Sequence, residues 1–306
     1  MKSLGGNESV ERQMPTRRAL LGSGAAASLA FSQNAFSAPV EPAALPFTVS
    51  INIEIMFPRT MPRAQRLEVV AAQGMKAFSF WHATEREQDA MLEVMSRTGL
   101  KCASVSGTAK AGGTTGLTKP GAEQAYLDEI AEFVKVAKKM GGALPIIFPG
   151  ALQPDIPWET QRANLVRGLR LAGEIAHEHE IVLTLEPEDQ YESPHMAIHK
   201  CSEAFPIIEE VAHPNVKICF DIYHLQLSEG NITNNLKMGL EKDWIRLVQI
   251  GESPGRKEPG TGETDYGYIF RVLRAAGYTG YVDTEHGTTS TPEYAINVVK
   301  KLALQA

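Results

Sequence analysis

Apolar residues along the chain gather into eight short runs, separated by segments in which apolar positions recur every three or four residues. The runs are rich in β-branched and aromatic residues and cover 48–57, 76–81, 101–106, 144–149, 181–186, 216–222, 245–250 and 281–285. Between them, one helix face is predicted by Leu127, Ile130, Phe133, Val134 and Ala137, and another by Leu165, Leu169, Leu171 and Ile175. The pattern therefore predicts eight strand–helix units.

Eight such units between residue 48 and residue 306 match a (β/α)8 TIM barrel of the α/β class in number and in length. The strand runs are almost continuously apolar, which is typical of parallel strands buried on both faces. Glycines that precede strands, at positions 74, 99, 141 and 277, suit helix C-caps. A doubly wound open sheet is the alternative, but a glycine-rich phosphate turn after the first strand is missing.

The first part of the chain reads as a targeting segment. Arg17 and Arg18 precede a mildly apolar stretch rich in Gly, Ala and Ser, which ends at the small-residue pattern Ala35-Phe36-Ser37. This pattern predicts a twin-arginine export signal over 1–37, a linker over 38–47 and the barrel over 48–306, and hence a periplasmic protein. The alternative is a frayed N-terminus that contains two arginines by chance.

Composition and charge exclude several kinds of partner. The 306 residues carry a net charge of −6 and form no basic stripe, which argues against nucleic acid. No apolar run reaches the roughly 18 residues that a membrane span needs. Three cysteines without a CxxC pair do not make a disulfide framework. A small molecule is thus the expected partner, and a homo-oligomer is left open.

Polar residues stand at the ends of four consecutive predicted strands: Glu186, Asp221, Gln249 and Glu285. They are 35, 28 and 36 residues apart, about one strand–helix unit each, so a barrel would place them around one side of its mouth. Three carboxylates this close repel one another unless a cation lies between them. Carboxylate and amide oxygens suit a divalent metal, Mg²⁺ or Mn²⁺. Any one of them alone could simply bond a loop amide.

A longer motif is more specific. The segment 248–263, VQIGESPGRKEPGTGE, together with Asp265-Tyr266, resembles the seventh-strand motif of hydroxypyruvate isomerases, which belong to the xylose isomerase-like sugar isomerase and epimerase barrels. Residues 51–57 (INIEIMF), 220–226 (FDIYHLQ) and 230–233 (GNIT) resemble the first strand, the sixth strand and the turn after it. The resemblance extends from about residue 48 to the end of the chain.

The resemblance implies a role for each matching residue. Glu186 and Glu285 match the two acid/base glutamates, which also bind the metal, and Asp221 and Gln249 match the remaining metal ligands. Substrate contacts are implied for His224, for Arg256 in the loop over the site and for Glu54 on the first strand, with Glu263 as the anchor of that loop.

The sequence departs from the family's pattern around the predicted pocket. The second strand ends in Trp81-His82, which could stack on and bond to a sugar, where the family carries an acidic residue. The run after Glu285 and the end of the fourth strand differ as well. Tyr223, next to Asp221, is expected to point away from the barrel interior on a period of two.

The predicted activity is that of a metal-dependent isomerase, which moves a carbonyl in a small hydroxy-keto acid or sugar through an enediolate. Glu186 and Glu285 would act as acid and base. The alternative is a ketose 3-epimerase, because returning the proton to the other face of the same carbon gives epimerisation, or else a keto-glycoside lyase or hydrolase. A non-catalytic sugar-binding barrel is the second alternative.

Overall fold

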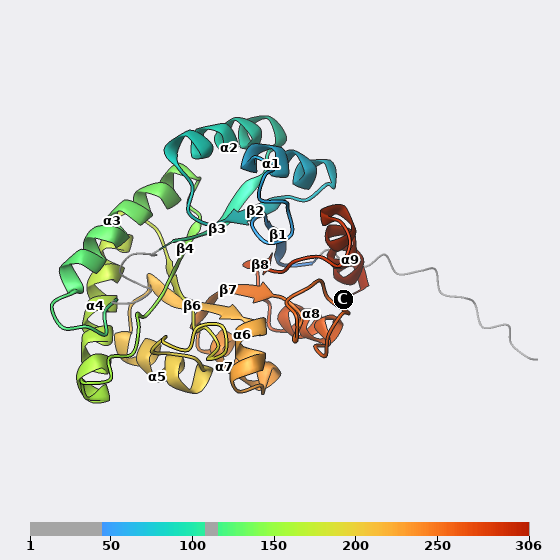
Figure 1. The fold of residues 1–306 in the computed structure, drawn as a ribbon. Helices are drawn as coiled ribbons and strands as arrows, with labels where there is room; N and C mark the ends of the chain where they lie inside the picture. The colour runs from blue at the N-terminus through green and yellow to red at the C-terminus, as the bar shows by residue number, and fades with distance from the viewer. Residues whose placement is uncertain (1–44, 108–115, 306) are drawn as a thin grey trace, which may run out of the picture. The chain divides into compact units, whose positions relative to one another are not determined.

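A computed structural model describes residues 45–107 and 116–305, in which eight parallel strands close into a barrel surrounded by helices (Figure 1). The strands are β1 (Thr48–Asn52), β2 (Ala77–Phe80), β3 (Lys101–Ser106), β4 (Leu144–Ile147), β5 (Leu183–Leu185), β6 (Val216–Asp221), β7 (Ile245–Ile250) and β8 (Tyr281–Thr284). Each strand pairs with the next along the chain, and β8 pairs with β1. The predicted (β/α)8 barrel is therefore confirmed.

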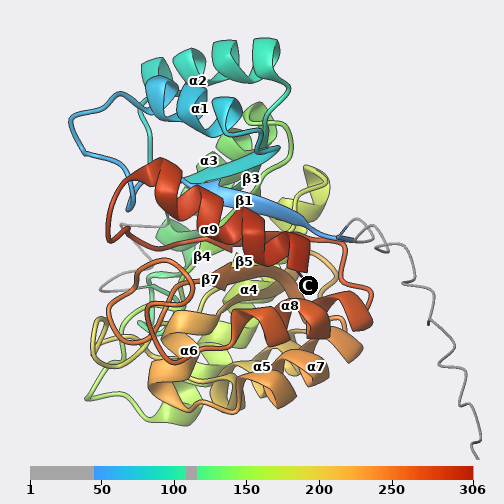
Figure 2. The same cartoon turned by 90° about the vertical axis from the view of Figure 1, so that its right-hand side faces the viewer.

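The helices form the outer layer of the barrel, as Figures 1 and 2 show. They are α1 (Arg63–Ala72), α2 (Glu85–Thr98), α3 (Glu123–Lys139), α4 (Trp158–Glu178), α5 (Cys201–Val211), α6 (Ile222–Ser228), α7 (Ile232–Glu241), α8 (Tyr266–Ala275) and α9 (Pro292–Gln305). The glycines predicted to end helices take positive φ angles of 75°, 75°, 88° and 67° at positions 74, 99, 141 and 277. Other residues are strained in this conformation.

On the face predicted for α3, Leu127 is half-buried and the other four residues, Ile130, Phe133, Val134 and Ala137, are buried. The prediction for α4 was wrong at one position. Leu165 and Leu169 are buried, whereas Leu171 is exposed. Leu171 lies two residues after Leu169, which is about 200° around the helix, so both side chains cannot face the barrel.

Leu171→Gln is expected to change the free energy of unfolding by at most about 0.5 kcal/mol, because an exposed leucine buries little apolar surface. Urea denaturation of the variant and the wild type measures this difference. A loss of more than about 1 kcal/mol would show that the Leu171 side chain packs against the rest of the protein.

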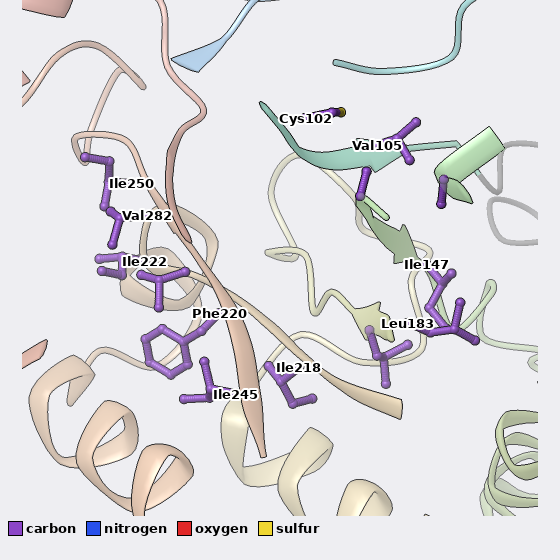
Figure 3. Packing of buried hydrophobic residues seen from close by; sticks show 14 of the residues in the cluster. Cys102, Val105, Ile147, Leu183, Ile218, Phe220, Ile222, Ile245, Ile250 and Val282 are labelled. Carbon is purple, nitrogen blue, oxygen red and sulfur yellow. The ribbon is translucent and has the colours of Figure 1, made fainter. Parts of the chain in front are cut away.

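In the described part of the chain, buried apolar side chains pack in two clusters. The larger cluster joins the outward faces of the strands to the helices, and Figure 3 shows Ile218, Phe220 and Ile245 among its members on β6 and β7. The smaller cluster consists of Leu144, Ile146, Cys219 and Leu247. Because side chains alternate along a strand, the residues two positions after Cys219 and Leu247 face the interior as well. These residues are Asp221 and Gln249, so apolar packing inside the barrel gives way to polar groups toward the carboxyl ends of the strands.

The predicted export signal over 1–37, most of the predicted linker and the loop over 108–115 lie outside the described residues. Among the helices that the structure does describe, none is long and apolar enough to cross a membrane.

Candidate active site

Three carboxylates converge at the carboxyl ends of β5, β6 and β8. Glu186 follows β5 directly, Asp221 is the last residue of β6, and Glu285 follows β8. All three side chains are buried. One guanidinium nitrogen, Nη2 of Arg256, lies 3.2 Å from Asp221 Oδ2 and 3.1 Å from Glu285 Oε2. The sequence prediction of clustered strand-end carboxylates therefore agrees with the geometry.

Burial and crowding change the acidity of the two glutamates. Loss of solvent, followed by repulsion from Glu285 and Asp221, raises the pKa of Glu186 well above its usual value. Burial raises the pKa of Glu285 to about 7, although Arg256 opposes this shift. For Arg256, burial disfavours the charged form, but attraction to Glu285 and Asp221 outweighs it and raises the pKa. Both glutamates therefore hold a proton more readily than an exposed glutamate does.

Gln249 lies on β7 at the same level of the sheet as Asp221, its register partner on β6. Its amide is buried: Oε1 is 2.9 Å from Cys219 Sγ, and Nε2 is 3.5 Å from Asp283 Oδ2. Asp283 also accepts a hydrogen bond of 2.6 Å from the Ser79 hydroxyl. Sequence reasoning missed Asp283, although its place two residues before Glu285 on one strand face was a usable signal.

His224 reaches the carboxylates from α6. This helix begins directly after β6, and Asp221 caps it by accepting a 2.9 Å hydrogen bond from the Tyr223 amide. Nε2 of His224 lies 3.8 Å from Glu186 Oε1 and 3.6 Å from Asp221 Oδ2. On the other side of the ring, Nδ1 lies 2.6 Å from Asp189 Oδ2. The predicted substrate contact is thus at the site, with Asp189 as a partner that the sequence did not suggest.

Tyr223, which the strand period directs away from the barrel interior, contacts two charged side chains. Its hydroxyl donates a 2.5 Å hydrogen bond to Glu192, and the guanidinium of Arg256 lies 4.8 Å from the centre of its ring. Glu192 also accepts a 3.0 Å hydrogen bond from Arg256. The period of two ends where the strand becomes a helix, so it gave no guide to the direction of Tyr223.

The loop that carries Arg256 is held by two buried glutamates. Glu252 accepts hydrogen bonds from the amides of Gly260 and Thr264, and Glu258 accepts them from the amide and hydroxyl of Thr289. Glu263, the predicted anchor, is exposed and accepts a 3.2 Å hydrogen bond from Gln226. The buried carboxylates Glu252 and Glu258 thus anchor this loop through their side chains, together with backbone hydrogen bonds such as that from Gly287 to Arg256.

Trp81 and His82 follow β2 at the mouth of the barrel, and both are exposed. The Trp81 indole, with 38% of its surface exposed, donates a 2.9 Å hydrogen bond to Glu285 Oε1. Arg63 donates to the carbonyl oxygen of His82. Glu54 lies two residues after the end of β1, in the segment that leads to α1. It forms ion pairs of 2.7 Å with Arg63 and 3.2 Å with Arg66, which both belong to α1.

Trp81→Phe is expected to lower kcat/KM roughly 10-fold, since it keeps an aromatic ring but removes the indole donor to a carboxylate, worth about 1.5 kcal/mol. Steady-state kinetics measures the effect. Unchanged kcat/KM would contradict a role for the Trp81–Glu285 hydrogen bond.

The donor set fits a hard divalent cation. Ligand atoms of Glu186, Asp221 and His224 all lie within 4.8 Å of one another and are buried. Glu285 shares an Arg256 nitrogen with Asp221, so its carboxylate borders the same space. Oxygen donors with at most one imidazole are the surroundings that Mg²⁺ or Mn²⁺ prefers.

Comparison with known proteins gives the family. Residues 67–302 match the family described as xylose isomerase-like TIM barrel. Hydroxypyruvate isomerase of Escherichia coli is 33% identical over 174 residues, 57% of this chain and 67% of that protein. 2-Oxo-tetronate isomerase of Cupriavidus necator is 27% identical over 224 residues, 72% of this chain and 85% of that protein. A 3-keto-D-glucoside 4-epimerase structure from E. coli shares the fold at 20% identity, with a TM-score of 0.71 over 84% of this chain and 98% of that one. The chain belongs to the xylose isomerase-like TIM barrel family.

Proposed function

We propose that this chain is a metal-dependent isomerase that moves a carbonyl to the adjacent carbon in a small hydroxy-keto acid or sugar. The observation that carries the proposal is the pair of buried glutamates, Glu186 and Glu285, whose pKa values are both raised and which flank Asp221 at the barrel mouth. Relatives named hydroxypyruvate isomerase and 2-oxo-tetronate isomerase support the reaction class.

The proposed reaction is a proton transfer between neighbouring carbons. One glutamate removes the proton from the hydroxyl-bearing carbon next to the carbonyl, and the other returns a proton to the former carbonyl carbon. The hydroxyl proton of the first carbon passes to the former carbonyl oxygen, so that the carbonyl and the hydroxyl exchange places. When bound, the metal stabilises the negative charge that develops on the substrate oxygens. Glu186, Asp221, Gln249 and Glu285 are the residues that we propose to hold it.

Other side chains orient the substrate. The Nε2 atom of His224 faces the space beside Glu186 and Asp221, where it contacts a substrate oxygen. Arg256 forms ion pairs with Asp221 and Glu285, and so places a positive charge next to these two carboxylates. Trp81 forms an exposed aromatic surface beside Glu285, to which a sugar ring can stack.

Hydrogen exchange with solvent tests this proposal directly. The chain, loaded with Mn²⁺ or Mg²⁺ in D₂O, is incubated with hydroxypyruvate, 2-oxo-tetronate and neutral ketoses, and deuterium uptake next to the carbonyl is followed by NMR. We expect uptake with at least one compound and its loss after chelation of the metal. No uptake with any of them, or full uptake in chelator, would refute the proposal.

The products separate the alternatives. A carbonyl on the neighbouring carbon indicates an isomerase, whereas inversion at one carbon indicates a ketose 3-epimerase. Release of an alcohol from a 3-keto-glycoside indicates a lyase or hydrolase. Binding without any turnover indicates a sugar-binding barrel. The exposed indole of Trp81 is the feature that favours a sugar among these substrates.

We also propose that the protein is exported by the twin-arginine route to the periplasm. Arg17 and Arg18 before the small-residue stretch support this. N-terminal sequencing of the protein from a bacterial periplasmic fraction is expected to begin at Ala38, and a cytoplasmic protein with an intact Met1 would contradict export.

A further inference from the structure

Next to the three carboxylates of the site, Asp189 forms a close contact with the imidazole ring of His224. Asp189 lies in the segment that follows β5, four residues after the strand ends, and His224 lies on α6. Oδ2 of Asp189 is 2.6 Å from Nδ1 of His224, and both side chains are buried, with 0% and 2% of their surfaces exposed. A contact this short between buried groups is a charge-assisted hydrogen bond.

Both carboxylate oxygens of Asp189 are used, and by different donors. Oδ1 accepts 2.7 Å and 2.9 Å hydrogen bonds from the backbone amides of Tyr191 and Glu192, while Oδ2 faces His224. These hydrogen bonds outweigh the effect of burial and lower the pKa of Asp189 to about 2. The carboxylate therefore carries no proton to donate, and the proton between it and His224 belongs to Nδ1.

One competing contact has to be weighed. The backbone amide of Asp189 lies 3.4 Å from the same Nδ1, and it would require an unprotonated Nδ1. That contact is at the long limit of a hydrogen bond, whereas the carboxylate contact is 0.8 Å shorter and involves a charge. An unprotonated Nδ1 would place a lone pair against a carboxylate oxygen at 2.6 Å, which is repulsive.

The other ring nitrogen faces the site and has no close partner among residues 45–107 and 116–305. Nε2 lies 3.8 Å from Glu186 Oε1 and 3.6 Å from Asp221 Oδ2, and both distances exceed a hydrogen bond. The ring orientation that Asp189 imposes thus leaves Nε2 directed to the space between these two carboxylates. An oxygen of a bound molecule in that space is the group it can reach.

We infer that Asp189 is a positioning residue, which fixes His224 with its proton on Nδ1 and with Nε2 presented to a substrate oxygen between Glu186 and Asp221. The inference rests on the proposed function for the identity of the bound molecule. It extends that function by a residue that acts through His224 and touches no substrate itself. In metal and protease sites, a carboxylate behind a histidine selects the tautomer in the same way.

The geometry explains why an amide cannot replace this carboxylate. Asparagine has one acceptor oxygen, so it can serve either the His224 ring or the two backbone amides, and its NH₂ group then faces the other donors. Because two backbone amides donate to the Oδ1 position and only the ring faces Oδ2, we expect the asparagine oxygen to stay with the amides and the NH₂ to face the ring. Nδ1 must then give up its proton, and Nε2 must gain one. Asp189→Asn therefore changes the tautomer of His224 with a minimal change in shape.

The experiment compares Asp189→Asn with Asp155→Asn, which removes the same charge from an exposed position on the loop before α4. Long-range ¹H–¹⁵N correlation spectra of the metal-free full chain at pH 8 report which ring nitrogen is protonated, and a His224→Gln spectrum assigns the signal. We expect Nδ1 of His224 to be protonated in the wild type and in Asp155→Asn, and Nε2 in Asp189→Asn. An unprotonated Nδ1 in the wild type, or an unchanged tautomer in Asp189→Asn, would overturn the inference.

Kinetics supplies the second readout. With whichever substrate the exchange assay identifies, kcat/KM per folded enzyme is expected to fall roughly 10- to 100-fold in Asp189→Asn and to stay unchanged in Asp155→Asn. Wild-type kcat/KM in a folded Asp189→Asn protein would overturn the positioning role. If the wild type turns over none of the substrates, the proposed function fails, and the tautomer spectra still decide the role of Asp189.

Discussion

Glu285→Gln is expected to lower turnover roughly 10²- to 10⁴-fold, the range for loss of a positioned general acid or base. The side chain keeps its shape and can still accept the indole hydrogen bond from Trp81, which lies 2.9 Å away. What is lost is the ability to take up and release a proton, for which burial has set a pKa of about 7. Deuterium exchange next to the substrate carbonyl is expected to fall with turnover.

A loss of turnover in Glu285→Gln shows a catalytic role for Glu285 only if the variant is folded. Arg256 retains its ion pairs with Asp221 and Glu192, so circular dichroism and the thermal transition are expected to match those of a folded protein. Glu178→Gln is the matched control, because Glu178 is the exposed last residue of α4. A folded Glu285→Gln enzyme with full activity would remove Glu285 from the mechanism.

Much of the site could be predicted because barrel geometry converts sequence spacing into position. Glu186, Asp221, Gln249 and Glu285 each end an apolar run about one strand–helix unit after the previous one. In a closed parallel barrel such residues must meet at one end. Asp221 and Gln249 are indeed register partners on adjacent strands, and the same alternation explains why Asp283 lies level with Gln249.

The residues that escaped prediction lie where no period applies. Asp189 and Glu192 come from the irregular segment after β5. Tyr223 lies in the first turn of α6, where the period of two of the strand no longer applies. Glu252 and Glu258 turn back to bond amides within their own loop or the next one, a contact that depends on loop shape. The periodicity of a strand or helix predicts on which face a side chain lies, but it does not predict which loop that side chain contacts.

His286 is the source of the second large effect, which concerns stability rather than turnover. The ring is buried, its Nδ1 lies 2.8 Å from the Gly287 carbonyl oxygen, and Nε2 has no hydrogen-bond partner among the described residues. Burial lowers the pKa of His286 to about 4, so the neutral ring is the folded form. In the unfolded chain the pKa returns to about 6.5.

Because His286 binds a proton more weakly in the folded chain than in the unfolded chain, acid lowers the free energy of unfolding. Between pH 6.5 and pH 4 the unfolded chain binds the proton and the folded chain does not, so acid favours unfolding. The contribution of His286 is fully present above pH 6.5 and is lost as the pH falls, by about 2 kcal/mol at pH 5 and about 3 kcal/mol at lower pH. Glu186 and Glu285, whose pKa values are raised, shift stability in the opposite direction, so the variant has to be compared with the wild type at each pH.

Urea denaturation of the metal-free wild type and His286→Asn at pH 7.5 and pH 5 isolates this contribution. Asparagine can retain a donor to the Gly287 carbonyl but does not titrate, so the variant is expected to lose about 2 kcal/mol less than the wild type between the two pH values. His195→Asn, at an exposed position, is expected to follow the wild type. Equal losses in wild type and His286→Asn would mean that the buried ring accepts a proton without cost, and the unpartnered Nε2 would then need a partner that forms in acid.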